Sequence, residues 1–260
     1  MIIECGKEME FRILSYLEKE PELNTFLTAD IKNFGFDSDF QRVFVSLEKE
    51  EIQGVFLTFY QNLLVSGRAE GDDREFFEIY IEKKHPQVIM GKAEDIEPLL
   101  EFTKDAYILK KRPMYSLKKG DRLELSPLEL KTGVPGDEDK IFDFLMSIDE
   151  IKGLYRSKEM IRDRLKNRDG FHYYLETEEA LIAHGNSTAI GPYSAMLGGI
   201  CVRPEYRKQG IGGKLVSRIA KEILERGLIP CLFSERAEEN NLFVRLGFEK
   251  IGMWATLERR

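Results

Sequence analysis

The stretch from Ile200 to Leu215, ICVRPEYRKQGIGGKL, constrains the fold more than any other part of the chain. An apolar run from Ala195 to Val202 leads into this stretch and overlaps its first residues. The run lies between Pro192 and Pro204. Its length suits a buried strand better than a helix. The stretch therefore predicts a strand that leads into a helix through a short turn containing glycine.

The predicted helix runs from Ile211 to Arg226. Apolar residues recur at helical spacing and would form one buried ridge: Ile211, Leu215, Ile219 and Ile223. Charged residues occupy most of the other positions, and Gly227 provides the stop that glycine often supplies after a helix. This segment is expected to be an amphipathic helix against a sheet.

A turn of this kind directs backbone N–H groups and the positive end of a helix dipole at one spot, which favours phosphate. Gly210 and Gly212 would let a ligand approach the backbone closely. The spacing is not that of the mononucleotide P-loop, and the third glycine of the dinucleotide fingerprint is missing. The alternative is a glycine turn that only tightens the junction between strand and helix.

The same residues resemble the acyl-CoA-binding signature of the GNAT superfamily of N-acetyltransferases, Arg/Gln-x-x-Gly-x-Gly/Ala, met here by Arg207, Gly210 and Gly212. The resemblance covers about the C-terminal half of the chain. It implies that backbone amides from Lys208 to Lys214 hold the coenzyme A pyrophosphate. The coenzyme-binding residues that it implies are Ile200, Cys201, Val202, Arg207, Lys208, Gln209, Gly210, Ile211, Gly212, Gly213, Lys214, Asn240 and Phe243.

Composition narrows the class of protein. The chain has 260 residues, a net charge of -7 and a pI near 5.3, and no basic block that would neutralise nucleic acid. The acidic balance suits a cationic amine substrate, and equally an ordinary cytosolic protein. Its cysteines, Cys5, Cys201 and Cys231, lack metal-ligand spacing, so no metal is expected. No apolar run approaches membrane-spanning length, which predicts a cytoplasmic protein with no membrane partner.

The pattern of elements predicts an α/β (α+β) protein of two tandem units. The first is predicted to have helices at 7–19, 24–35, 74–84 and 96–106 and strands at 43–47, 54–60, 63–65, 88–90 and 114–117. The second is predicted to have strands at 128–130, 172–175, 180–184, 195–202, 229–233 and 251–257, with helices at 137–148, 157–166, 211–226 and 240–246. This repeated order is similar to the GNAT fold, a mixed, mostly antiparallel sheet flanked by helices. The predicted domains are 1–126 and 127–260.

The N-terminal half carries an acidic loop, from Gly67 to Glu75, where the phosphate-binding turn would lie. Its carboxylates, Glu70, Asp72, Asp73 and Glu75, would occupy the place of a pyrophosphate and repel it. We therefore expect a degenerate unit without a phosphate site. The roles open to it are scaffold, homodimer surface or lid.

The resemblance implies direct attack of a neutral amine on the thioester, with backbone groups of Ile200 and Val202 aligning the carbonyl. The strand from Ala195 to Val202 holds no carboxylate to act as general base. Weaker candidates come from its neighbours: Glu176, His172, His184 and Glu235. Each also has an ordinary structural or solvated interpretation, and a relay of bulk water would serve as well.

Asn240 to Phe248 resembles the family's Tyr-x-x-Leu-Gly-Phe segment, whose tyrosine commonly protonates the leaving thiolate. Phe243 stands at that position and has no hydroxyl, so a core role is favoured there. Tyr193 and Tyr206 are other tyrosines that could supply the acid.

The sequence thus predicts an N-acyltransferase that moves an acetyl group from acetyl-CoA to the primary amine of a small-molecule or amino-acid-like acceptor. The alternative is a non-catalytic acyl-CoA-binding or regulatory protein. Phe243 and the missing strand carboxylate favour the alternative, whereas the glycine turn serves both.

Overall fold

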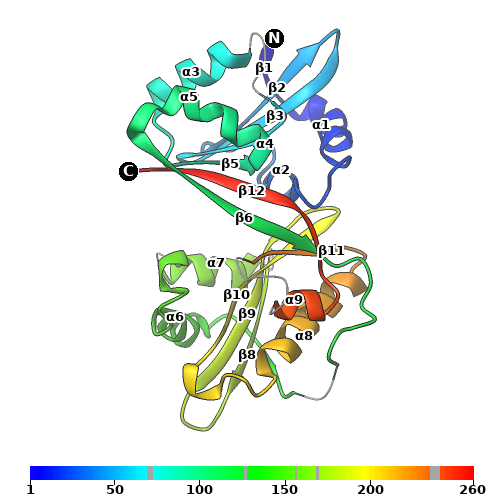
Figure 1. Cartoon of the computed structure of the whole chain (residues 1–260), viewed down its shortest axis with the longest axis vertical. Coiled ribbons are helices and arrows are strands. Elements are labelled where there is room, and N and C mark those ends of the chain that lie inside the picture. The colour runs from blue at the N-terminus through cyan, green and yellow to red at the C-terminus, as the bar shows by residue number, and fades with distance from the viewer. Residues whose placement is uncertain (69–72, 126–127, 156, 168–169, 235–240) are drawn as a thin grey trace. The chain divides into compact units, whose positions relative to one another are not determined.

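The computed structural model describes residues 1–68, 73–125, 128–155, 157–167, 170–234 and 241–260 (Figure 1). Two compact units share the chain. The N-terminal unit comprises Met1–Met114, Phe233–Glu235 and Lys250–Arg260, and the C-terminal unit comprises Tyr115–Leu232 and Arg236–Glu249. The predicted domain boundary, at residues 126–127, lies outside the described residues and stays a prediction.

The N-terminal unit is a sheet with helices on both faces (Figure 1). Its strands are β1 (Ile2–Cys5), β2 (Gln41–Glu48), β3 (Glu51–Phe59), β4 (Asn62–Ser66) and β5 (Val88–Lys92), with most of β6 (Tyr107–Ser116) and β12 (Glu249–Arg259). Its helices are η1 (Lys7–Met9), α1 (Glu10–Leu17), α2 (Thr25–Phe34), α3 (Asp73–Lys84), α4 (Ala93–Ile96), η2 (Glu97–Leu99), α5 (Leu100–Thr103) and η3 (Lys104–Ala106). The strand order is β1-β2-β3-β4-β5-β12-β6.

Pairing in this sheet is antiparallel for β1 with β2, β2 with β3, β3 with β4, and β5 with β12, whereas β4 and β5 run parallel. Alternate strand residues face opposite sides, as the pleat requires. Leu57 is buried with Ile13 of α1, and its neighbour Phe56 with Phe77 of α3. Two apolar cores therefore lie on the two faces of one sheet.

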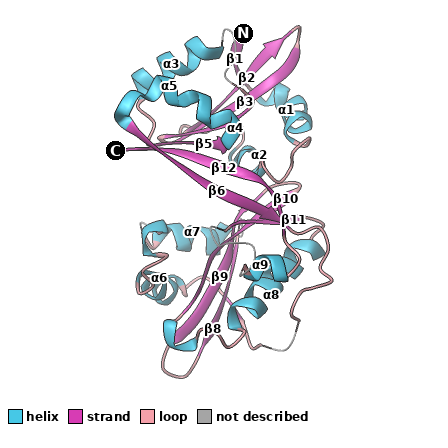
Figure 2. Cartoon of the chain, viewed as in Figure 1, coloured by secondary structure: helices cyan, strands magenta, loops and turns pink. Residues whose placement is uncertain are grey.

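The C-terminal unit is a smaller sheet, also between helices (Figure 2). Its strands are β7 (Lys131–Thr132), β8 (Phe171–Glu176), β9 (Leu181–Ile190), β10 (Ser194–Val202) and β11 (Ile229–Phe233), and its helices are α6 (Glu138–Met146), η4 (Lys152–Leu154), α7 (Glu159–Asn167), η5 (Pro204–Tyr206), α8 (Ile211–Glu225) and α9 (Leu242–Arg245). The strand order is β11-β10-β9-β8-β7. Only the pair of β10 with β11 is parallel.

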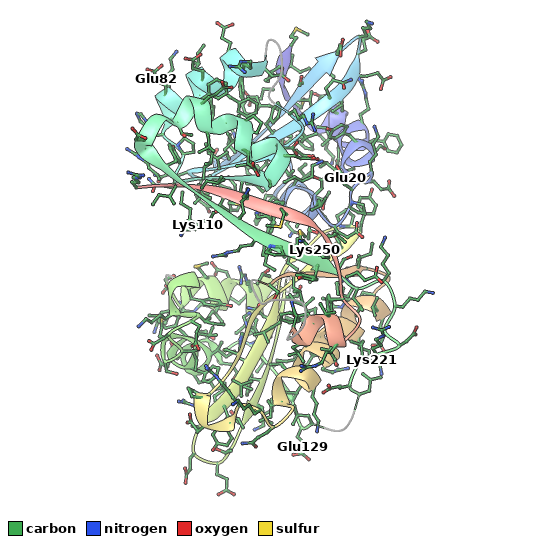
Figure 3. The ribbon with its side chains drawn as sticks, viewed as in Figure 1. Glu20, Glu82, Lys110, Glu129, Lys221 and Lys250 are labelled. Atoms are coloured by element: carbon green, nitrogen blue, oxygen red, sulfur yellow. The ribbon has the colours of Figure 1, made fainter. Side chains whose placement is uncertain are left out.

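Helix α8 covers one face of this sheet, and α6 and α7 cover the other (Figure 1). The predicted ridge of α8 is buried, with Leu215 and Ile219 packed in a core that includes Leu197 of β10. The opposite side of the helix is polar: Lys221 projects from α8 (Figure 3) and pairs with Glu225 at 3.7 Å. Because α8 packs firmly, the position of its first turn beside the end of β10 is well defined.

The predicted fold class is confirmed: each unit is a mixed, mostly antiparallel sheet flanked by helices. Some elements differ from the prediction. Residues 128–130 are not a strand, and β7 follows them. The helix expected at 96–106 is a series of short α and 3-10 turns around Pro98. β6 begins at Tyr107 rather than Met114, and β1 was not predicted.

Candidate functional site

The parallel strands β10 and β11 separate after a short contact. Their pairing joins Ser194 with Ile229, Ala195 with Pro230 and Met196 with Cys231, while β10 continues to Val202. Beyond Met196, the described residues offer β10 no pairing partner in β11. The edge of β10 from Leu197 onward is therefore available for hydrogen bonds to an extended ligand.

A bulge lies in the separated part of β10. The register of β10 against β9 shifts between Gly198 and Cys201, and Gly199 has a φ of +58°. A Cβ at Gly199 would collide with the Tyr155 hydroxyl group. Glycine suits both the positive φ at this position and the close approach of the Tyr155 hydroxyl group. The bulge therefore depends on a glycine at residue 199.

The turn after β10 leads into the N-terminus of α8. Lys208 and Gly210 have positive φ values of +63° and +79°, and Gly210 is the N-cap of the helix. No side chain caps this end, and the first turn contains no acidic residue. The first backbone N–H groups of α8 lack intrahelical partners by geometry, because Lys214 N–H is the one that bonds Gly210 O, at 3.2 Å. This end of α8 can receive an anion.

The turn is open at two of its glycines. A Cβ at Gly210 would meet no atom within 4 Å, and one at Gly212 would make only ordinary contacts with Leu242 and Val202. Gly213 lies differently, since its buried backbone lies against the Glu124 carboxylate, 2.5 Å from where a Cβ would stand. Gly210 and Gly212 therefore leave the approach open, whereas Gly213 serves packing.

The guanidinium group of Arg207 has partners within the protein. Its Nε donates to Val202 O at 2.9 Å, and its NH1 donates to Glu150 Oε1 at 3.0 Å. This contact lowers the pKa of Glu150. Lys208 and Gln209 are exposed beside the turn, and Lys214 is half-buried. In this arrangement Arg207 ties the turn to the end of β10, while the flanking lysines contribute positive charge.

The strand residues predicted to contact coenzyme A alternate in direction. Ile200 and Val202 are partly buried against the core under α8, whereas Cys201 is buried with α6 and α7. Burial raises the pKa of the Cys201 thiol to about 12. Cys201 is therefore an inert core thiol at neutral pH.

Phe243 lies on α9, and Asn240 lies outside the described residues. The Asn241 side chain caps this short helix by accepting from Phe243 N–H at 3.0 Å. The Phe243 ring packs edge-on against Phe248, with 6.1 Å between centroids, at the border of the main core. Phe243 makes the core contact that its apolar ring favours.

The two histidines of this unit form a buried chain. His184 Nδ1 lies 3.0 Å from Gly199 O, and His172 Nδ1 lies 2.9 Å from His184 Nε2. A carbonyl oxygen can only accept, so His184 Nδ1 carries the proton and its Nε2 accepts from His172. Burial, more than the nearby Arg164 charge, lowers the pKa of both rings. A neutral His184 with both nitrogens engaged supports the bulge and is not placed to act as a base.

The other candidate bases and acids are spread across the unit. Glu176 ends β8 and pairs with Lys131 and, at 3.6 Å, with Lys140, and the bond to Lys131 is the main cause of its lowered pKa. Tyr193 lies just before β10, at the end opposite the turn. Glu235 lies outside the described residues. The structure does not bring Glu176 or Tyr193 to the bulge.

Two residues at the bulge were not predicted. Tyr155 follows η4 and Asn186 lies on β9, where Asn186 Nδ2 donates to the Tyr155 hydroxyl oxygen at 3.2 Å. The sequence did hold a signal for Asn186. The strand was predicted to end at His184, but a polar run without charged residues, His184 to Thr188, continues it. Polar residues inside a buried strand often mark a site.

A family model matches part of the chain. Residues 186–257 match a family model described as FR47-like protein, a segment that begins on β9 and includes β10, the glycine turn and α8. No curated protein sequence matches this chain.

Solved structures resemble the chain over its full length. A Drosophila protein aligns with a TM-score of 0.70 and 14% identity, covering 100% of this chain and 98% of that chain. A tandem GNAT protein from the clavulanic acid biosynthesis pathway aligns with a TM-score of 0.58 and 13% identity, covering 99% of this chain and 97% of that chain. A GNAT-family acetyltransferase from Colwellia psychrerythraea gives 0.56 and 15%, covering 100% of both chains.

The resemblance to the GNAT superfamily is confirmed at the level of the fold: the chain has the fold of the GNAT acetyltransferases, including a tandem GNAT protein. In the described part of the chain, no helix is long and apolar enough to cross a membrane. The same residues contain no cluster of three or more His, Cys, Asp or Glu side chains placed to hold a metal ion.

Proposed function

We propose that this protein is an N-acyltransferase that transfers the acetyl group of acetyl-CoA to the primary amine of a small-molecule or amino-acid-like acceptor. One observation carries the proposal. β10 leaves β11 after Met196 and continues alone to Val202, and the turn that follows leads to the N-terminus of α8, where no side-chain cap is found among the described residues. A free strand edge suits an extended pantetheine arm, and an uncapped helix end suits a pyrophosphate.

The residues around the turn fit this co-substrate. Backbone N–H groups from Lys208 to Lys214 would bind the pyrophosphate, with the open space at Gly210 admitting its oxygens. Backbone groups of Ile200 and Val202 would hold the arm and align the thioester. Acetyl-CoA supplies an activated acyl group, so the protein's part is positioning and charge stabilisation.

We infer that the N-terminal unit has lost this function and serves as scaffold, so that each chain binds one acetyl-CoA. The loop after β4 is already bonded to a carboxylate, because Gly67 N–H donates to Asp95 Oδ2 at 3.1 Å. The first turn of α3 carries Asp73 and Glu75. The other acidic residues of this loop, at 70 and 72, lie outside the described residues. A pyrophosphate would be repelled here.

A second candidate is a non-catalytic acyl-CoA-binding or regulatory protein. It is favoured by Phe243, which has no proton to give, and by β10, which has no carboxylate. The neutral histidine chain adds no base.

Calorimetry with acetyl-CoA, followed by thiol release across a panel of amines, tests both candidates. We expect one acetyl-CoA per chain and release of coenzyme A thiol that depends on the amine. Binding without release for any amine supports the second candidate. No binding contradicts both, and two equivalent sites contradict the degenerate role of the N-terminal unit.

A homodimer and a cytoplasmic location stay predictions of the sequence, which sedimentation and cell fractionation would test. We propose no nucleic-acid partner, since the net charge is -7.

A further inference from the structure

The hydroxyl group of Tyr155 lies against the bulge of β10. Its ring is anchored in the core formed with α6 and α7, and the residue is only 6% exposed. The hydroxyl approaches Gly199 so closely that no Cβ could stand there. A phenol is therefore held at the bulge, in the stretch of β10 that β11 does not pair with.

Asn186 orients this hydroxyl and is itself incompletely bonded. Its Nδ2 donates to the Tyr155 oxygen at 3.2 Å, so the Tyr155 proton must point to some other acceptor. No acceptor for that proton is found among the described residues. Asn186 is 0% exposed, and its Oδ1 has no hydrogen-bond partner. That oxygen lies 3.2 Å from where a Cβ on Gly198 would stand.

Unpaired polar groups are rare inside proteins, and each calls for a partner. Here an O–H donor and an amide oxygen meet at Gly198 and Gly199, where the absence of side chains leaves the backbone open. Two other side chains of this unit do not supply this donor: both nitrogens of His184 are used, and Phe243 carries no hydroxyl. A ligand with a polar acceptor beside the bulge would complete the bonding of the Tyr155 hydroxyl group, whereas the Asn186 oxygen calls for a donor.

We propose that Tyr155 donates its hydroxyl hydrogen bond to the carbonyl oxygen of the bound thioester, and that Asn186 positions Tyr155 for this contact. The inference rests on the proposed function. In the reaction the amine nitrogen attacks the carbonyl carbon, and the oxygen takes negative charge, which the Tyr155 O–H stabilises. The carbon–sulfur bond then breaks, and the electron pair leaves with sulfur. The amine proton passes to solvent, solvent protonates the thiolate, and Tyr155 keeps its proton throughout.

The first test needs binding but no turnover. The carbonyl stretch of bound [1-13C]acetyl-CoA would be measured by isotope-edited infrared spectroscopy in the wild type and in Tyr155→Phe. A hydrogen bond to oxygen lowers the stretching frequency, so we expect a higher frequency in the variant, with acetyl-CoA affinity within about threefold. Tyr107→Phe is the matched control, since Tyr107 is also 6% exposed and donates to Pro86 O at 2.6 Å in the N-terminal unit. It should leave the frequency unchanged.

The second test uses turnover with an acceptor found in the amine panel. Removing one donor of this kind typically costs roughly a hundredfold or more in kcat. We expect Tyr155→Phe to show that loss in kcat with little change in the KM for acetyl-CoA. Asn186→Leu should lower kcat by less, and the double variant should be no worse than Tyr155→Phe. A purely structural pair would instead lower thermal stability and leave kcat per folded molecule unchanged.

The outcomes separate the two ideas. If acetyl-CoA does not bind the wild type, the proposed function is wrong and this inference goes with it. If acetyl-CoA binds and the carbonyl frequency is the same in Tyr155→Phe, only the assignment of Tyr155 is overturned. Asn186→Gln, which retains an amide, should recover part of the activity lost in Asn186→Leu if Asn186 acts through hydrogen bonding.

Discussion

Each unit has a parallel strand pair among its described residues, and the two pairs, β4 with β5 and β10 with β11, differ in how long the strands stay together. In the N-terminal unit, β4 and β5 are in register from Asn62 with Val88 to Val65 with Gly91, almost the whole of β4. In the C-terminal unit, β10 is longer but stays with β11 only from Ser194 to Met196. The same connection can therefore close a sheet or open it for a ligand, depending on local residues.

Glycine accounts for much of this difference. Gly91 lies so close to the Val65 carbonyl oxygen that a Cβ would collide with it, so this glycine brings β4 and β5 together. Gly199 instead takes a left-handed conformation that forms a bulge. The helix that follows each pair differs as well, because α3 begins with acidic residues and α8 does not. Both local differences favour a ligand in the C-terminal unit alone.

The largest effect is expected from Gly210→Glu, which gives the C-terminal turn the acidic character of its N-terminal counterpart. A carboxylate a few ångströms from the pyrophosphate should weaken acetyl-CoA binding by roughly a hundredfold or more. Gly227→Glu is the control, because Gly227 also has a positive φ and open space but follows the far end of α8. Calorimetry should find near-normal affinity in the control. Equal loss in both variants would mean that backbone strain, and not the turn, explains the result.

Acidification should affect the two units in opposite directions. The folded-state pKa of His172 and His184 lies below the unfolded value near 6.5, so stability falls as the pH drops below about 6.5. Together the two histidines should lower the free energy of unfolding by roughly 3 kcal/mol for each pH unit of acidification below that value. In the N-terminal unit, burial raises the pKa of Asp30 to about 7. The contribution of Asp30 to the free energy of unfolding is therefore lost as the pH rises from about 4 to 7, and it is recovered on acidification.

Hydrogen exchange resolved by peptide, at pH 7 and pH 5 and corrected for intrinsic rates, measures this difference. Protection should decrease around β8 and β9 and hold or increase around α2. Uniform loss of protection in both units would contradict the effect expected of Asp30, and unchanged protection around β8 and β9 would contradict the assignment of neutral buried histidines.

A moderate effect on stability is expected from Gly91→Ala, which places a methyl group between the paired strands β4 and β5. The added methyl group would press on the Val65 carbonyl, and overpacking of this kind costs roughly 1–3 kcal/mol. Gly252→Ala on β12 is the control, since its Cβ would lie 3.6 Å from Leu23 in ordinary contact. Urea denaturation should show a loss only in the first variant. Acetyl-CoA affinity should not change in either.

The smallest effect is expected from Phe243→Tyr, which restores the residue that the resembling segment of the superfamily carries. Phe243 packs at the border of the core against Phe248, and the inference above assigns the donor to Tyr155. Turnover should therefore rise by far less than the roughly hundredfold typical of a general acid. A rise of that size would place the missing acid at residue 243 and weaken the case for Tyr155.

The sequence predicted the elements that carry strong periodicity. The hairpin of β2 and β3, the helix α8 and the strand β10 all lie where apolar spacing put them, because burial of one face imposes that spacing. The start of β6 was missed, since Lys110 and Lys111 are exposed and its charged pattern resembles a loop. β1 was missed for a similar reason, as it is short and mostly half-exposed at the edge of its sheet.

The candidate site could be predicted only in part. The glycine turn has a local signature, so the candidate phosphate site at Lys208 to Lys214 could be predicted from its glycines and from their resemblance to the superfamily's signature. The meeting of Tyr155, Asn186 and Gly199 depends on three separate elements and on a bulge that no local pattern announces. The hydrogen-bonded chain of His172 and His184 is likewise a product of strand register, which pairs β8 with β9.

The pairing of β12 with β5 has a consequence for biosynthesis. Strand β12 follows the C-terminal unit in sequence, yet it lies between β5 and β6 in the sheet of the N-terminal unit, with Trp254 opposite Lys92 and Ala255 opposite Gly91. Chains emerge from the ribosome N-terminus first, and domains usually fold in that order. Here the N-terminal unit lacks an inner strand until β12, which follows the C-terminal unit in sequence, has been translated. Its unpaired β5 edge must stay protected from aggregation until then, so the part of the protein made first is completed last.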